Sequence, residues 1–234
     1  MYKKLINHIN KILILFISIL ILLLIYYVNL KNKKIRDLEI ENSFLSINKD
    51  VKTNGDIYMI GNSIISAADW NELLKSNRII NLGFSGITTM DAVMYVDKLL
   101  PGRPDLLFIM LGVNDIKVNA PWEVAYENYY NLIYSFKLLS PKTKINIISV
   151  LPTNYSGFNN YEIDNLEIKR LNNAISEMCL KYHYNFIDCY DDFSNNNGEL
   201  YTEFTYDGLH LNSFGYDKLA FWIKPYLQIK KNEN

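Results

Sequence analysis

The feature that most constrains the fold is the alternation, from residue 56 onward, of short apolar runs with segments of helix length. Such alternation is typical of a mostly parallel sheet with helices on both faces. The expected strands are residues 57–60, 78–82, 105–111, 144–150 and 185–189. The expected helices are residues 64–75, 88–99, 121–139, 161–182 and 213–228. The sequence therefore predicts an α/β fold.

Five strands joined by helical crossovers indicate a flavodoxin-like layout, a three-layer α/β/α arrangement with a five-stranded parallel sheet. In sheets of this kind, binding and catalytic sites form beyond the carboxyl ends of the strands. The polar motifs described below all follow such strand ends, so we expect them to lie near one another.

An uncharged apolar run precedes this pattern at residues 12–28, and Ser18 is its only clearly polar member. At about 1.5 Å per residue, a helix of this length just crosses the hydrocarbon core of a membrane. The run ends in Tyr26, Tyr27 and Val28, without the small residues of a signal-peptide cleavage site. It predicts an uncleaved single-pass membrane anchor.

The anchor divides the chain into four expected parts. Residues 1–11 form a basic N-terminal segment, residues 12–28 the transmembrane anchor, residues 29–54 a linker or stalk, and residues 55–230 a single domain. Lysines lie on both sides of the anchor, so the positive-inside rule nearly cancels. We favour an extracytoplasmic domain.

Composition excludes several classes of function. With 24 Lys and Arg against 25 Asp and Glu, the chain lacks the basic excess typical of nucleic-acid binding, and we expect no nucleic-acid partner. Its two cysteines, Cys179 and Cys189, belong to no zinc-binding cluster. They are either free thiols or, outside the cytoplasm, one disulfide.

A serine directly follows the first expected strand. The motif Gly61-Asn62-Ser63 lies at a strand-to-helix turn, where hydrolases place a nucleophile. A serine at this position is also, and more commonly, a helix N-cap.

Two further loops carry candidate hydrogen-bond donors. Gly86 lies in the loop after the second strand, where a glycine lets backbone N–H groups face a ligand. Asn114 follows the third strand, and its side-chain amide is a candidate donor to a developing oxyanion. Singly, each is also explained as an ordinary turn residue.

A histidine and a carboxylate precede the last expected helix. Asp207 and His210 are three residues apart, a spacing that lets the carboxylate reach one imidazole nitrogen and leaves the other free for a serine. The other histidines, His8 and His183, have no carboxylate at such a spacing.

Together and in this order, the four motifs resemble those of the SGNH hydrolases, the GDSL-type lipase, esterase and acylhydrolase superfamily. The resemblance covers residues 56–228 and implies catalytic roles for Ser63, Asp207 and His210. It also implies an oxyanion hole formed by the backbone N–H groups of Ser63 and Gly86 and the side chain of Asn114. No metal or organic cofactor is implied.

One position departs from the family pattern. The family usually has Asp before the nucleophile, whereas this chain has Asn62. Asn keeps a short polar side chain that can hold the turn, so we expect activity to survive.

The expected function is that of a membrane-anchored serine esterase, which hydrolyses small acyl esters, for example O-acetyl esters, of carbohydrate or lipid. Two alternatives remain at this point. An acyl group on Ser63 could pass to a glycan hydroxyl, which would make the protein an O-acyltransferase. The fold could also serve as a catalytically inactive binding module, an alternative that only Asn62 supports. Oligomeric state does not follow from the sequence.

Overall fold

The computed structural model describes residues 2–47, 57–100 and 102–227, and the chain forms two compact units, Met1–Lys49 and Asp50–Asn234. The first unit is one helix, α1 (Tyr2–Ile47), which continues past residue 28 through most of the expected linker. Within α1, Lys11–Ile35 is long and apolar enough to cross a membrane, a test that a signal sequence also passes. The Ser18 hydroxyl donates to the Ile14 carbonyl (2.9 Å), so the polar group in this stretch is satisfied by the helix itself.

The second unit contains the predicted parallel sheet, which confirms the α/β fold. Within the described residues its strand order is β2-β1-β3-β4-β5, and each neighbouring pair is parallel. The strands are β1 (Ile57–Gly61), β2 (Ile79–Gly83), β3 (Leu106–Met110), β4 (Lys144–Ile148) and β5 (Asn185–Ile187). This is the flavodoxin-like order, in which the first crossover runs to one edge and the later ones run to the other.

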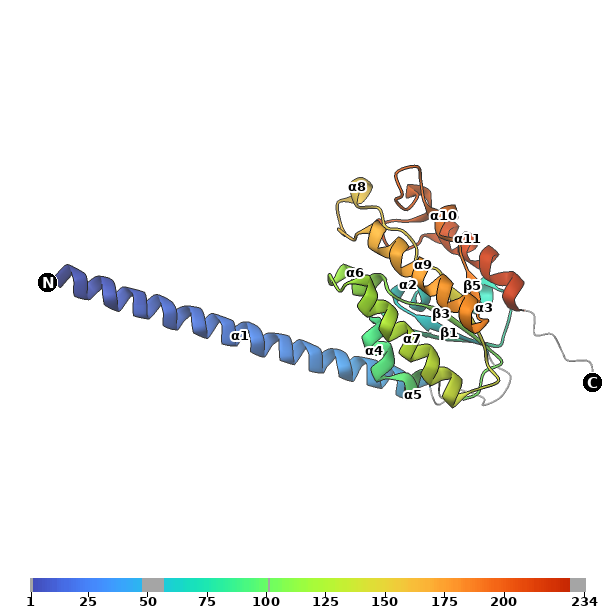
Figure 1. Ribbon diagram of the computed structural model, residues 1–234, viewed down its shortest axis with the longest axis horizontal. Helices are drawn as coiled ribbons and strands as arrows, with labels where there is room; N and C mark the ends of the chain where they lie inside the picture. The colour runs from blue at the N-terminus through green and yellow to red at the C-terminus, as the bar shows by residue number, and fades with distance from the viewer. Residues whose placement is uncertain (1, 48–56, 101, 228–234) are drawn as a thin grey trace, which may run out of the picture. The chain divides into compact units, whose positions relative to one another are not determined.

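Helices cover both faces of this sheet. They are α2 (Ser63–Ser66), α3 (Trp70–Leu73), α4 (Thr89–Met94), α5 (Val96–Leu99), α6 (Val113–Lys117), α7 (Trp122–Leu139), α8 (Tyr155–Phe158), α9 (Asn165–Tyr182), α10 (Tyr190–Phe193) and α11 (Ser213–Ile223), with 3₁₀ turns η1 (Thr202–Phe204) and η2 (Lys224–Leu227). Helices α4, α7 and α9 pack side by side on one face (Figure 1). Helix α11 packs against α3 on the other face.

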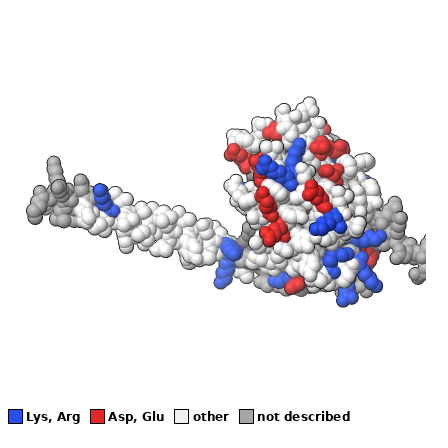
Figure 2. All heavy atoms as spheres, in the orientation of Figure 1, with Lys and Arg blue, Asp and Glu red and all other residues white. Residues whose placement is uncertain are grey.

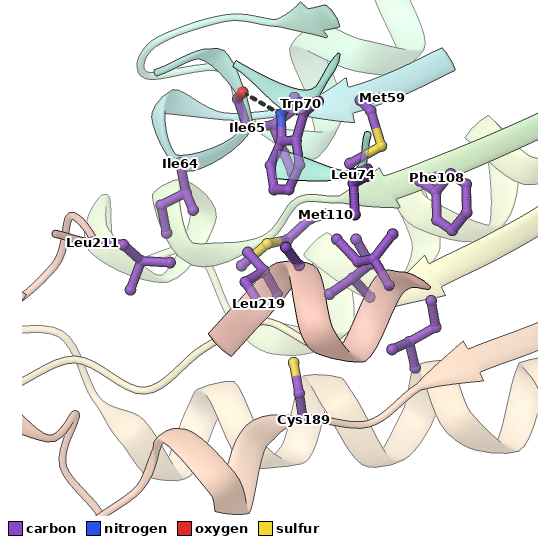
Figure 3. Close-up of a cluster of buried hydrophobic side chains, with 14 of the residues drawn as sticks. Met59, Ile64, Ile65, Trp70, Leu74, Phe108, Met110, Cys189, Leu211 and Leu219 are labelled. Carbon is purple, nitrogen blue, oxygen red and sulfur yellow. Dashed lines mark hydrogen bonds between the residues drawn. The ribbon is translucent and has the colours of Figure 1, made fainter. Parts of the chain in front are cut away.

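Alternating side chains of the strands build the two cores. Met59, Phe108 and Met110 face a cluster completed by Trp70 and Leu219, and all five side chains are buried (Figure 3). The period of two in a strand sends the neighbouring residues to the opposite face, where α7 packs. There the Tyr129 hydroxyl, fully buried on α7, donates to the Ile109 carbonyl (3.3 Å).

The helices differ from the sequence prediction at their ends, and local capping explains why. The expected helix 64–75 is divided into α2 and α3, because Asp69 caps a new helix by accepting from the Glu72 N–H (3.0 Å). The expected helix 161–182 begins only at Asn165, because Asp164 caps it. The expected helices 88–99 and 213–228 are likewise divided, into α4 and α5 and into α11 and η2.

The two cysteines are free thiols, which settles the alternative that the sequence left open. Cys179 on α9 and Cys189 after β5 are both buried and do not pair. Burial raises the pKa of each thiol to about 12, so neither is a thiolate near neutral pH.

Candidate active site

Ser63 is the first residue of α2, immediately beyond the carboxyl end of β1. The helix is capped by the preceding residue, because the Asn62 side-chain oxygen accepts from the Ile64 N–H (2.9 Å). The interpretation of Ser63 as the N-cap is therefore wrong, and its hydroxyl is not used for capping. Asn62 is 1% exposed, and its Nδ2 is the buried side-chain polar atom without a partner in the described part of the chain.

The short helix that carries Ser63 is held in place by two side chains from other elements. The Asn81 amide on β2 donates to the carbonyls of Ile65 (2.9 Å) and Ala68 (3.1 Å). The Tyr216 hydroxyl on α11 donates to the Ile64 carbonyl (2.9 Å). These bonds satisfy carbonyls in α2 and just after it, and they fix the turn that carries Ser63 against the sheet.

The structure brings the three predicted catalytic residues together. Ser63 Oγ lies 3.0 Å from His210 Nε2, although 147 residues separate the two in sequence. His210 Nδ1 lies 2.7 Å from Asp207 Oδ2. An ionised carboxylate can only accept hydrogen bonds, so Nδ1 carries the ring proton and Nε2 is left to accept from the serine hydroxyl.

Asp207 is held by the backbone that carries His210. Its Oδ1 accepts from the N–H groups of His210 (2.8 Å) and Leu209 (3.0 Å), while Oδ2 faces the imidazole. Burial is the largest influence and acts to raise the pKa of Asp207. The hydrogen bonds from His210 and from the two backbone N–H groups outweigh it and hold the pKa below its usual range. Asp207 is therefore ionised near neutral pH.

A glycine makes this turn possible. Gly208 has a φ of +88°, and a Cβ at this position would lie 2.4 Å from the Asn154 carbonyl oxygen. That close approach allows the Asn154 N–H to donate to the Gly208 carbonyl (2.7 Å). The Thr205 hydroxyl then donates to the His210 carbonyl (2.6 Å).

The two other predicted site residues lie at neighbouring strand ends. Gly86, with a φ of +73°, is in the loop between β2 and α4, and Asn114 is on the first turn of α6 after β3. The Asn114 Nδ2 donates one hydrogen to the Ile87 carbonyl (2.9 Å), which ties α6 to the loop of Gly86. An amide nitrogen carries two hydrogens, so one remains for a ligand.

A buried carboxylate that sequence reasoning missed strengthens this tie. Asp115, 3% exposed, accepts from the Thr89 hydroxyl (2.6 Å) and from the Thr89 N–H (3.0 Å) at the start of α4. Burial raises its pKa, although the hydrogen bonds from Thr89 oppose that shift. The one sign of this carboxylate's role in the sequence is its position, a charged residue directly after Asn114 in an apolar segment. Its partner, 26 residues away, could not be predicted.

Two aromatic rings flank the imidazole of His210. The Tyr206 ring is stacked with the ring of His210 at 6.0 Å between centroids, and the Tyr161 ring meets it edge-on at 6.1 Å. Lys117 Nζ lies 4.4 Å from the centroid of Tyr161. Tyr206 is 63% exposed, so its ring offers an accessible apolar surface beside His210.

The sequence pattern of the GDSL-like lipase/acylhydrolase family matches residues 60–218, which is more than half of the chain. The chain belongs to this family. Members of the family are lipases and acylhydrolases by name, so membership indicates a hydrolase that acts on ester bonds. The family match spans Ser63, Gly86, Asn114, Asp207 and His210.

Solved structures resemble this GDSL-family domain. A protein of Streptococcus pneumonia named for platelet activating factor is 30% identical, with a TM-score of 0.76, over 81% of this chain and 92% of that one. A GDSL-like lipase of Bacteroides thetaiotaomicron, 23% identical with a TM-score of 0.64, covers 79% of this chain and 95% of its own, and shares the fold.

A curated relative combines this region with further sequence. The N-acylneuraminate cytidylyltransferase of Escherichia coli O18:K1:H7 is 29% identical over 197 residues, which cover 81% of this chain. The chain spans only 45% of the length of that relative.

Proposed function

We propose that this GDSL-family chain is a membrane-anchored serine esterase that removes small acyl groups, for example acetyl, from carbohydrate esters. The observation that carries the proposal is the continuous line of hydrogen-bonding contacts from Ser63 Oγ to His210 Nε2 (3.0 Å) and from His210 Nδ1 to Asp207 Oδ2 (2.7 Å). This is the geometry in which a histidine acts as general base toward a serine nucleophile.

The reaction follows from the roles of these atoms. His210 Nε2 takes the hydroxyl proton as Ser63 Oγ attacks the ester carbonyl, and the imidazolium then protonates the departing alkoxide. A water molecule, activated by the same nitrogen, hydrolyses the acyl-Ser63 ester. Asp207 keeps the proton on Nδ1 and stabilises the charged ring throughout.

The oxyanion of the tetrahedral intermediate is stabilised by the donors that surround Ser63. The Ser63 N–H belongs to the first turn of α2, where backbone N–H groups have no partner within the helix. The second hydrogen of Asn114 Nδ2 and the Gly86 N–H complete the set that the family resemblance implies. One such donor typically contributes about 3 kcal/mol to transition-state stabilisation.

A carbohydrate substrate is supported by two observations. The exposed ring of Tyr206 beside His210 is a surface on which the apolar face of a sugar can pack. The Escherichia coli relative is named for N-acylneuraminate, an acylated sugar acid. The apolar helix segment Lys11–Ile35 supports the membrane anchor, and we place the catalytic domain outside the cytoplasm.

Loss of hydrolysis on removal of the nucleophile tests this proposal. Ser63→Ala should abolish turnover of p-nitrophenyl acetate, whereas Ser66→Ala, on the same helix but exposed, should leave it intact. Circular dichroism of both variants checks that the fold is kept. Turnover at the wild-type rate in folded Ser63→Ala would reject Ser63 as the nucleophile.

A further inference from the structure

The amino-terminal edge of the sheet carries a basic surface that the proposed chemistry does not use. Four lysines lie there, at the carboxyl ends of α7 and α9 and at the start of β4; they are Lys137, Lys142, Lys144 and Lys181. We call these lysines the basic edge. Figure 2 shows Lys and Arg side chains gathered at the lower right of the folded body, over the ends of α7 and α9.

A surface depression lies within the basic edge. Its volume is about 460 Å³, and its lining includes Lys137, Lys142, Lys144 and His183 but no Asp or Glu. The Lys137 ammonium is fixed there by the carbonyls of Pro141 (3.0 Å) and Thr143 (3.3 Å). A depression lined by lysines, with no carboxylate in its lining, is complementary to an anionic group such as a phosphate.

The residues that line the depression differ in charge from those that line a second pocket, beside α6. That pocket, of about 830 Å³, is lined by Glu162, Asp164 and Glu167 and contains no Lys or Arg in its lining. Residues 55–234 hold 15 Lys and Arg against 21 Asp and Glu, so the domain is acidic overall. Its basic side chains at the depression are separated in space from the acidic side chains of this pocket. An anion is attracted to the basic edge and repelled from the acidic pocket.

Exposed apolar and aromatic side chains accompany the lysines. Leu138 is 66% exposed, Leu180 77% and Tyr134 57%. The Lys181 ammonium lies 5.1 Å from the ring centroid of Tyr182. Lysines interleaved with tyrosine and leucine are typical of surfaces that lie at the headgroup level of a membrane.

The chain enters the domain at the same edge. Leu106 on β3 pairs in register with both Ile57, the first residue of β1, and Lys144, the first residue of β4. Ile57 is therefore at the edge where the strands begin, and it is the first described residue that follows α1 in the chain. Ser63 follows the opposite, carboxyl-terminal edge of the same sheet.

We propose that the basic edge binds the anionic headgroups of the membrane in which α1 is anchored. The proposal rests on the membrane anchor of the proposed function. Because the catalytic residues follow the opposite edge of the sheet, this contact directs Ser63 away from the bilayer. The accessible substrates are then acyl groups on glycans above the membrane rather than on the lipids that surround α1.

Amine labelling of the full-length protein tests the proposal. The protein is inserted into nanodiscs of phosphatidylcholine alone or mixed with phosphatidylglycerol, and the acetylation rate of each lysine is followed by mass spectrometry. In the anionic discs we expect Lys142, Lys144 and Lys181 to react about fivefold more slowly, the factor that corresponds to the usual attraction of one basic residue to an anionic membrane. High salt should restore the rates. Lys117 and Lys169, outside the basic edge, should react equally in both discs.

A charge-reversal variant provides the matched control. Lys142→Glu with Lys144→Glu should restore rapid labelling of Lys181 in anionic discs, whereas Lys169→Glu should leave it slow. Equal labelling of the basic-edge lysines in both kinds of disc would overturn the proposal. It would also be overturned if these lysines were protected as strongly in detergent micelles as in anionic discs, because that protection would come from a contact between copies of the chain. A chain that does not enter the discs would overturn both the anchor and the basic edge. Hydrolysis of p-nitrophenyl acetate by the same samples tests the esterase separately, so the two failures are distinguishable.

Discussion

At the scale of single residues, substitutions of Asp207 and His210 test whether the two side chains act in one proton transfer. His210→Ala should lower kcat by roughly 10⁴-fold or more, because it removes the base that activates Ser63. Asp207→Asn should lose less, because the carboxylate orients and supports the ring without taking the proton. The losses should be far from additive in the double variant, since both residues serve one proton transfer. Steady-state kinetics on p-nitrophenyl acetate measures all three.

The pH dependence of the wild-type rate is linked to the charge of Asp207. Its pKa is lowered in the folded protein, so the carboxylate is already ionised at the pH where an imidazole titrates. The rate should therefore depend on pH through the group that accepts the proton of Ser63, because only a neutral imidazole can act as the base. A profile that His210→Ala does not change would show that the turn before α11 has only a structural role.

Residue identities also show how far the sequence alone could go. The order of the motifs sufficed to predict that Ser63 and His210 meet, because one follows a strand end and the other precedes the last helix. It also predicted that Gly86 and Asn114 follow neighbouring strands. The role of Asn62 was only half predicted. Its capping oxygen fits the expectation that it holds the turn, while its buried unpartnered Nδ2 depends on packing that no local pattern records.

At the scale of elements, the tie between α4 and α6 should contribute measurably to stability. Asp115→Ala removes the acceptor for two buried donors of Thr89, and leaving such donors unsatisfied typically costs about 1–3 kcal/mol of unfolding free energy. Urea denaturation measures the loss. Asp97→Ala, on the nearby helix α5 but outside this network, serves as the control.

The same variant should also slow catalysis, because Asp115 sets the distance between the loop of Gly86 and the side chain of Asn114. A double-mutant cycle with Thr89→Val isolates the interaction between the two side chains. The unfolding free energy lost in the double variant should be clearly smaller than the sum of the losses in the two single variants. Additive losses would show that Asp115 and Thr89 act independently, which would contradict the tie.

The elements of the sheet were predicted closely, while the helices were predicted only in outline. Strands such as 144–150 are marked by runs of apolar residues, and β4 begins at the expected residue and ends only two residues early. Helix breaks depend on single capping residues, of which Asp69 and Asp164 are examples. Which N–H group a capping side chain accepts from depends on the folded structure. Hydrophobic periodicity in the sequence therefore did not predict these breaks.

At the scale of the whole molecule, α1 should retain the protein in the membrane. We expect the full-length chain to stay in the membrane fraction after alkaline carbonate extraction, because the apolar stretch Lys11–Ile35 is long enough to span the bilayer. Residues 50–234, which form the second compact unit, should be recovered in the soluble fraction. A full-length product found soluble and shortened near residue 30 would identify the apolar run as a cleaved signal.

Covalent labelling with a fluorophosphonate, a probe that reacts with activated serines, tests directly whether Ser63 is the nucleophile. We expect one equivalent of probe to attach to the full-length wild-type protein, peptide mass spectrometry to locate it on Ser63, and Ser66→Ala to be labelled equally. His210→Ala should react far more slowly, because its serine is no longer activated. Absence of labelling in active wild-type enzyme, or a label on any residue other than Ser63, would contradict the account.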